Sequence, residues 1–266
     1  TRHQIAEAIA DLFADVTCHQ IIIKNDLSIG GGWSQRIAKH RITPSNKQKV
    51  LDDLLKNVQF REGQDTVVVE IWLEDAQASV ATHIEITPNI PEPIVRWGWQ
   101  QLLDQDGVSY CGAVPLRLPL STLRDLIAQT QRLAKALQDV GAIGSYAPNF
   151  LITKQGEPIL LELNARVPLS AFALSIIQKL KGEIGEGFMT HYVHVPAKVP
   201  FHTIKDVLKH DHLLIETPNN LATKGVVPFN IGLLPYGKCS LVAMAPTWEE
   251  ARLLMEDAVS VLQKLS

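Results

Sequence analysis

Apolar residues recur at helical spacing in three stretches of the chain and predict three amphipathic helices. These stretches are residues 1–14, 120–140 and 248–265. The first carries its apolar face on Ile5, Ala8, Ile9, Leu12 and Phe13. Thr1 and Thr247 precede the first and last helices as N-caps, and Gly141 follows the middle one as a C-cap.

Runs of β-branched and other apolar residues predict strands between these helices. One short strand begins at Gln20 and ends at Lys24. A second, residues 66–74, carries Glu70 and continues through an acidic turn into a third strand at residues 78–86. A fourth lies within residues 156–166, where Gly156 leads an apolar run. Together the helices and strands predict an α+β fold.

Three polar side chains alternate along the last of these strands. Glu162, Asn164 and Arg166 are two residues apart, so they point to the same face of a strand. Carboxylate and amide oxygens suit Mg²⁺, and a guanidinium suits a phosphate or a carboxylate. The motif therefore fits a nucleotide polyphosphate site. A strand end with an exposed salt bridge is the alternative, and this segment alone does not decide between them.

A glycine loop follows the strand that ends at Lys24. Gly30, Gly31 and Gly32 allow backbone amides to approach an anion, and the lysine adds a positive charge. The loop lacks the Gly-Lys-Ser/Thr sequence of a Walker loop and the helix-linked Gly-x-Gly-x-x-Gly of a dinucleotide site. A hairpin turn is the alternative. Three consecutive glycines are too many for a tight hairpin, which favours a flap over phosphates.

Composition narrows the classes of protein. The 266 residues carry a net charge of −3 with a pI near 6.3, which argues against sequence-independent binding of nucleic acid. Cys18, Cys111 and Cys239 match no metal-ligand spacing and favour a reducing compartment. No apolar run is long enough to span a bilayer, so we expect a cytoplasmic protein without a membrane partner. Five histidines between residues 191 and 212 suggest zinc, but their spacing favours structural or surface roles.

Four motifs in chain order resemble those of the ATP-grasp superfamily of ligases. They are Lys24 with its glycine flap, the Val-Val-Glu70-Ile-Trp-Leu strand, residues 141–152, and residues 161–166. The resemblance covers about residues 5–195, and residues 225–266 look most like the branch with the pheganomycin-type peptide ligases. It implies two antiparallel-sheet subdomains, residues 1–73 and 74–266, that hold ATP between them. It also implies a small amino-terminal domain, for which this sequence has no room, so we expect a fragment or a processed chain.

The resemblance implies roles for individual residues. Lys24 would hold the ATP phosphates beneath the flap, and Glu70 would meet the adenine amino group. Arg166 would stabilise an acyl phosphate or orient the acceptor carboxylate. The implied nucleotide-binding residues are Lys24, Gly30, Gly31, Gly32, Glu70, Ile71, Trp72 and Leu73, the implied catalytic residues are Lys24 and Arg166, and the implied magnesium ligands are Glu162, Asn164 and Asn149.

Asn149 departs from the superfamily pattern, which usually has an acidic metal ligand at this position. An amide oxygen can coordinate Mg²⁺ but carries no charge, so we expect weaker binding of the second ion. The implied reaction joins a carboxylate to an amine through an acyl phosphate, using ATP and Mg²⁺ and small amino-acid-like substrates. A catalytically weak nucleotide-binding or scaffold protein is one alternative, and a ligase that phosphorylates an enol or a hydroxyl is another. The oligomeric state stays open, with a homodimer among the options.

Overall fold

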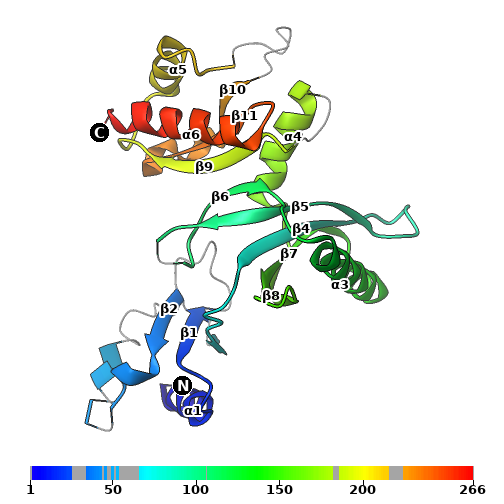
Figure 1. Ribbon diagram of the computed structural model, residues 1–266, viewed down its shortest axis with the longest axis vertical. Helices are drawn as coiled ribbons and strands as arrows, with labels where there is room; N and C mark the ends of the chain where they lie inside the picture. The colour runs from blue at the N-terminus through cyan, green and yellow to red at the C-terminus, as the bar shows by residue number, and fades with distance from the viewer. Residues whose placement is uncertain are drawn as a thin grey trace. The chain divides into compact units, whose positions relative to one another are not determined.

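Two compact units make up the chain in the computed structural model (Figure 1). The first unit comprises residues 1–76 and 103–110, and the second comprises residues 77–102 and 111–266. The structure describes residues 2–25, 34–43, 45–46, 49–50, 52–53, 66–105, 107–181, 186–215 and 224–265. Thr1 and the glycine loop with Gly30, Gly31 and Gly32 lie outside these ranges. Residues 103–110, assigned from the sequence to the larger subdomain, group with the first unit.

The first unit contains a three-stranded antiparallel sheet in the order β2-β1-β3. The strands are β1 (Gln20–Asn25), β2 (Ser34–Ala38) and β3 (Val67–Ile71), and a short 3₁₀ turn, η1 (Lys39–Arg41), follows β2. The helix α1 (Arg2–Ala14) buries Ile5 and Ile9 against Ile21, Ile23 and Ile37. Because side chains alternate along a strand, this packing leaves Lys24 of β1 on the face away from α1.

The second unit contains an eight-stranded sheet in the order β10-β11-β9-β6-β5-β4-β7-β8. The strand pairs β4–β5, β4–β7, β7–β8, β9–β11 and β10–β11 all run antiparallel. Its strands are β4 (Ala78–Ile86), β5 (Ile94–Leu103), β6 (Tyr110–Pro115), β7 (Gly144–Ile152), β8 (Pro158–Asn164), β9 (Phe188–His194), β10 (Gly225–Phe229) and β11 (Lys238–Met244). Its helices are α3 (Leu120–Asp139), α4 (Leu169–Lys181), α5 (Phe201–His210) and α6 (Trp248–Gln263), with a 3₁₀ segment η2 (Ile231–Tyr236). Helices with antiparallel sheets confirm the α+β prediction.

The helix α3 covers one face of β4 and β7 (Figure 1). Leu126 packs with Val80 and Phe150, and Ala134 packs with Ile84 further along β4. The residues of β4 and β7 at alternate positions therefore lie on the opposite face, which α3 does not cover and which we call the open face of the β4–β7–β8 sheet. Ala81, His83 and Ala147 on this face are buried. Asn149 of β7, which pairs with Ala81, lies on that open face.

The helix α6 packs on β9 and β11 near the carboxyl end of the chain (Figure 1). Its buried residues Met255 and Ala258 share a core with Val193 and Leu241. As the sequence predicts, Thr247 caps the helix, and its hydroxyl accepts a hydrogen bond from the Glu250 backbone N–H at 3.3 Å.

Removal of this cap should destabilise the second unit. Thr247→Ala leaves the Glu250 N–H without its side-chain acceptor, and we expect the free energy of unfolding to fall by about 1 kcal/mol. Urea denaturation measures the change. Thr247→Ser keeps the hydroxyl and serves as the matched control, so an equal loss in both variants would argue against the cap.

No helix in the described part of the chain is long and apolar enough to cross a membrane. The thiols of Cys18 and Cys239 are buried. Burial raises the pKa of Cys18 above its ordinary value and that of Cys239 to about 11. Both side chains are therefore protonated core thiols rather than nucleophiles.

Candidate functional site

Four polar side chains gather where β7 and β8 pair on the open face. Asn149 stands opposite Glu162, and its Nδ2 donates to Glu162 Oε1 at 2.6 Å. Asn164 Nδ2 donates to the same oxygen at 2.9 Å. Arg166 Nη2 donates to Asn164 Oδ1 at 3.0 Å, although β8 ends at Asn164. The structure thus brings together Asn149, Glu162, Asn164 and Arg166, which we call the β8 cluster.

A bulge in β8 determines which way Glu162 points. Asn149 pairs with Glu162, but Phe150 pairs with Leu160, so Leu161 is an extra residue. In an unshifted strand Glu162 would share the face of buried Phe150, which packs against α3. The bulge moves it to the open face beside Asn149.

The donor set of the β8 cluster suits a hard cation. It offers one carboxylate and two amide groups, and Mg²⁺ is commonly held by one or two carboxylates together with substrate phosphates. Within the described ranges, no three His, Cys, Asp or Glu side chains gather in a way that could hold a metal ion. Glu162 is therefore the single negative charge of the cluster, so a bound ion would depend on phosphate oxygens for further charge.

Tyr192 of β9 is a neighbour of the cluster that sequence reasoning missed. Val193 packs into the core beneath α6, so the adjacent Tyr192 faces the other way. Burial raises the pKa of the Tyr192 phenol, and the positive charge of Arg166 opposes that rise. Arg166 therefore lies within electrostatic range of a strand far from β8 in the sheet order. Only the tertiary fold reveals this proximity, because no motif links the two residues.

A second polar cluster lies in the first unit, on the face of its sheet away from α1. Lys24 Nζ forms an ion pair with Glu70 Oε2 at 2.5 Å. The side chains are 19% and 35% exposed, so each still reaches solvent. The register explains the contact, because Glu70 stands opposite Ile22, two residues before Lys24 on the same face. Two residues to which the resemblance gives nucleotide-binding roles are thus neighbours.

Arg36 and Trp72 extend this face of the first unit. The Arg36 guanidinium lies 5.0 Å from the centre of the Trp72 ring. Trp72 follows the end of β3, and its backbone N–H donates to Gln20 O at 2.9 Å. Sequence reasoning missed Arg36, although the buried Ile37 beside it already indicates that Arg36 points to the opposite face. We call Lys24, Arg36, Glu70 and Trp72 the β1 cluster.

The other expected nucleotide-binding residues are placed only in part. Ile71 ends β3 and is 43% exposed, and Leu73 follows directly after Trp72. Gly30, Gly31 and Gly32 lie outside the described residues. The hinge and flap roles therefore stay predictions.

Comparisons with known proteins give a consistent fold. No protein-family model matches the chain, and no curated protein matches its sequence. An N5-carboxyaminoimidazole ribonucleotide synthetase solved with ADP matches with a TM-score of 0.68 at 13% identity, covering 100% of this chain and 66% of that one. The carboxyaminoimidazole ribonucleotide synthase of Aspergillus clavatus, solved with ATP, gives a TM-score of 0.66 at 11% identity, covering 100% and 67%. The biotin carboxylase of Campylobacter jejuni, solved as a β,γ-ATP complex, gives 0.64 at 13%, covering 97% and 60%.

These neighbours have one fold in common. The chain has the ATP-grasp fold. It spans 60% to 67% of the length of the three structures. At 11% to 13% identity the likeness establishes the fold alone, so the chemistry of this ATP-grasp chain has to be argued from its own side chains.

Proposed function

We propose that the protein is an ATP-dependent ligase that joins a carboxylate to an amine and releases ADP and phosphate. The observation that carries the proposal is the β8 cluster, in which a carboxylate, two amides and a guanidinium share the open face of an ATP-grasp sheet. The β1 cluster adds a lysine suited to phosphate. The solved neighbours named above carry ATP or ADP, which supports a nucleotide as the common ligand.

In this proposal each cluster has its own role in nucleotide binding. Lys24 binds the phosphates beneath the loop of Gly30, Gly31 and Gly32, while Glu70 meets the adenine amino group. Ile71, Trp72 and Leu73 form the adenine hinge. Glu162, Asn164 and Asn149 hold Mg²⁺, which when bound would supply positive charge against the phosphate oxygens.

The proposed reaction has two steps. A substrate carboxylate oxygen attacks the terminal phosphorus of ATP, the bond from that phosphorus to the bridging oxygen breaks, and ADP leaves. Lys24 and Arg166 stabilise the negative charge on the transferring phosphoryl group. The amine nitrogen then attacks the carbonyl carbon of the acyl phosphate, loses a proton and expels phosphate, leaving an amide. The pheganomycin-like sequence features support small amino-acid-like substrates and a peptide-like product.

A product assay tests the proposal. Purified protein with MgATP is supplied with mixed carboxylates and amines, and ADP release is measured. Hydroxylamine in place of the amine converts an acyl phosphate into a hydroxamate, which identifies a carboxylate as the group that is phosphorylated. We expect ADP release that depends on an added acid, with a matching amount of hydroxamate. ADP release without hydroxamate would contradict carboxylate activation.

One observation favours a second candidate, a catalytically weak nucleotide-binding protein. The β8 cluster has a single carboxylate, because Asn149 stands opposite Glu162 where a second acid would add charge. Under this alternative we expect MgATP to raise the melting temperature, while no mixture of acids and amines leads to ADP release. Thermal shift together with the product assay separates the two functions.

Asn149→Asp tests the electrostatic role of that position. The variant sets a second carboxylate beside Glu162, so we expect the Mg²⁺ concentration for half-maximal ADP release to fall by about tenfold. Without Mg²⁺, the two carboxylates repel each other, and we expect a lower melting temperature that Mg²⁺ and nucleotide restore.

The control for this variant is Asn46→Asp, which makes the same charge change in the first unit. The Asn46 amide contacts Arg41 O and the Thr43 N–H rather than a carboxylate. Its Mg²⁺ dependence should match that of the parent protein. An unchanged Mg²⁺ dependence in Asn149→Asp would exclude Asn149 from the metal site.

A further inference from the structure

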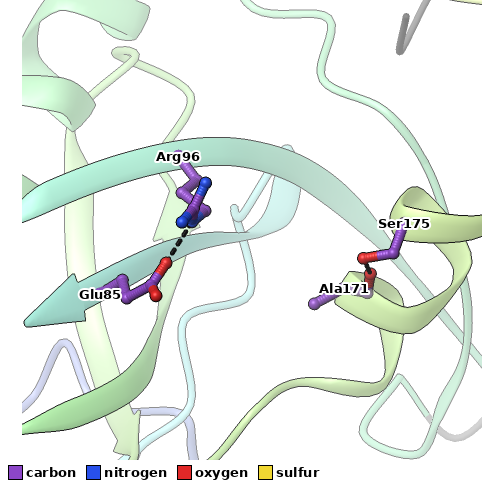
Figure 2. Close-up of polar contacts among 4 residues, drawn as sticks. All are labelled: Glu85, Arg96, Ala171 and Ser175. Carbon is purple, nitrogen blue, oxygen red and sulfur yellow. Dashed lines mark hydrogen bonds and ion pairs between the residues drawn. The ribbon is translucent and has the colours of Figure 1, made fainter. Parts of the chain in front are cut away.

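A charged pair on β4 and β5 lies on the same open face as the β8 cluster. Figure 2 shows the Glu85 carboxylate and the Arg96 guanidinium pointing toward one another, and Arg96 Nε donates to Glu85 Oε2. The side chains of Glu85 and Arg96 are 28% and 39% exposed, respectively. The pair is therefore held in place but remains accessible to a ligand.

The strand register assigns this pair to the open face. Ala81 pairs with Asn149, and Glu85 pairs with Ser145, with no register shift between them. Residues four apart on a regular strand share a face, so Glu85 points to the same side as Asn149. Asn149 in turn contacts Glu162 of the β8 cluster. The opposite face of β4, with Ile84, packs against α3.

A second bulge brings Arg96 to this face. Thr82 pairs with Gly98, whereas Ile84 pairs with Val95, so β5 has one extra residue opposite β4. Without the shift, Arg96 would stand opposite Ile84 on the face that α3 covers. The bulge moves it to the side of Glu85. Bulges recur beside active sites, where they redirect a side chain, and here each of two bulges delivers a charged residue to one face.

The Glu85–Arg96 pair carries one negative and one positive charge. The hydrogen bond from Arg96 holds the pKa of Glu85 below its ordinary value, so this carboxylate is ionised at neutral pH. Burial lowers the pKa of the neighbouring His83, which favours its neutral form. The pair thus offers one carboxylate and one guanidinium, which complement the ammonium and the carboxylate of an α-amino acid.

We propose that Glu85 and Arg96 form the head-group subsite for an α-amino acid substrate that carries a second carboxylate on its side chain. Arg96 binds the α-carboxylate and Glu85 binds the α-ammonium. The side-chain carboxylate extends toward the β8 cluster, where it is phosphorylated. This inference rests on the proposed ligase function and adds the class of acid that the ligase activates.

The spacing of the strands sets the reach of this substrate. β4 and β8 are separated only by β7, and Asn164 pairs with Ala147, two residues from Ser145. With ordinary strand spacing, the backbones of Glu85 and Asn164 lie about 12 Å apart. Glu, Arg and Asn side chains close part of this distance from both ends. A ligand that bridges them therefore needs its two charged ends separated by a short carbon chain.

The existing ion pair also provides discrimination between acids. A simple carboxylate that bound Arg96 would place a second negative charge beside the Glu85 carboxylate. A zwitterion also brings an ammonium, which pairs with Glu85 and offsets this repulsion. The pair should therefore weaken the binding of acids that lack an α-ammonium and strengthen the binding of zwitterions.

The test uses a panel of acids with hydroxylamine as the amine. The zwitterions are aspartate, glutamate and 2-aminoadipate. Glutarate lacks the ammonium, and 4-aminobutyrate lacks the α-carboxylate. We expect at least one zwitterion to support ADP release with a KM about tenfold or more below that of either analogue.

Two variants then each remove one charge of the subsite. Arg96→Gln should raise the KM for the zwitterion about tenfold or more with little change in kcat, because the subsite binds the head group and not the reacting atoms. Glu85→Gln should bring the KM values of glutamate and glutarate closer together, because it removes the charge that disfavours glutarate. Arg96→Lys retains a positive charge and should recover part of the affinity. Asp139→Asn, which breaks the exposed Lys135–Asp139 pair on α3, is the matched control and should leave every KM unchanged.

The outcomes separate this inference from the proposed function. If glutarate or another acid supports ADP release as well as the zwitterions, and Glu85→Gln and Arg96→Gln change no KM, the ligase proposal stands and the subsite is excluded. If no acid supports ADP release or hydroxamate formation, the ligase proposal fails. Stabilisation of the MgADP-bound protein by glutamate, lost in Arg96→Gln, would still support the subsite, and its absence in the parent protein would overturn it.

Discussion

Glu162→Gln should reduce acid-dependent ADP release by about a hundredfold or more, which is the loss typical for removal of one charge-stabilising group at a reacting centre. The amide is isosteric with the carboxylate, and its oxygen can still accept the hydrogen bonds that Asn149 and Asn164 donate to Glu162 Oε1. The fold should therefore survive. The variant lacks only the negative charge, which is the single one in the β8 cluster and the feature on which Mg²⁺ binding depends most.

Three measurements check this expectation. ADP release reports turnover, the melting temperature without ligand reports the fold, and the shift in melting temperature with MgATP reports binding. We expect the first and third to fall and the second to stay close to the parent value. Glu256→Gln is the control, because it removes an equivalent charge from an exposed ion pair with Arg252 on α6. Full turnover in Glu162→Gln would exclude the β8 cluster as the metal site.

The sequence predicts much of the local structure, because helix periodicity and capping depend on neighbouring residues. The bounds expected for β4 agree with the structure, and α6 begins at Trp248 with Thr247 as its cap. The shared direction of Glu162, Asn164 and Arg166 also follows from simple alternation and is confirmed. These features need no knowledge of which strands pair.

The register of the strands could not be predicted from the sequence in the same way. Two bulges each shift a strand by one residue, and each shift moves a charged side chain to the opposite face. Simple alternation puts Leu160 on the face of Glu162, whereas the pairing of Leu160 with Phe150 puts it on the other. The partnership of Glu85 with Arg96 depends on such a shift, so no periodicity in the sequence could have revealed it.

Contacts between residues that lie far apart in the sequence could not be predicted either. The Lys24–Glu70 ion pair requires β1 to pair with β3, although β2 lies between these two strands in the sequence. The effect of Arg166 on Tyr192 requires the segment that follows β8 to approach β9, although the two strands lie far apart in the sheet order. The motifs predict candidate site residues, and the tertiary structure identifies the neighbours of those residues.

Lys24→Met should abolish ADP release as thoroughly as Glu162→Gln, with a loss of about a hundredfold or more. Methionine keeps an unbranched side chain of similar length but has no charge for the phosphates. The melting temperature should change little, because the Lys24–Glu70 pair reaches solvent and such pairs contribute little to stability. Lys39→Met is the control, since Lys39 lies in the same unit and its ammonium donates to the backbone oxygen of Asp15.

The proximity of Glu70 permits a sharper test of what Lys24 does. Loss of the lysine leaves the Glu70 carboxylate without its 2.5 Å partner, and that charge could itself repel a phosphate. The double variant Lys24→Met with Glu70→Gln removes the repulsion while the ammonium stays absent. If Lys24 binds phosphate directly, the double variant should remain inactive and its KM for ATP should stay high. Recovery of turnover in the double variant would instead show that Lys24 serves mainly to neutralise Glu70, and the phosphate-binding role assigned to it would be wrong.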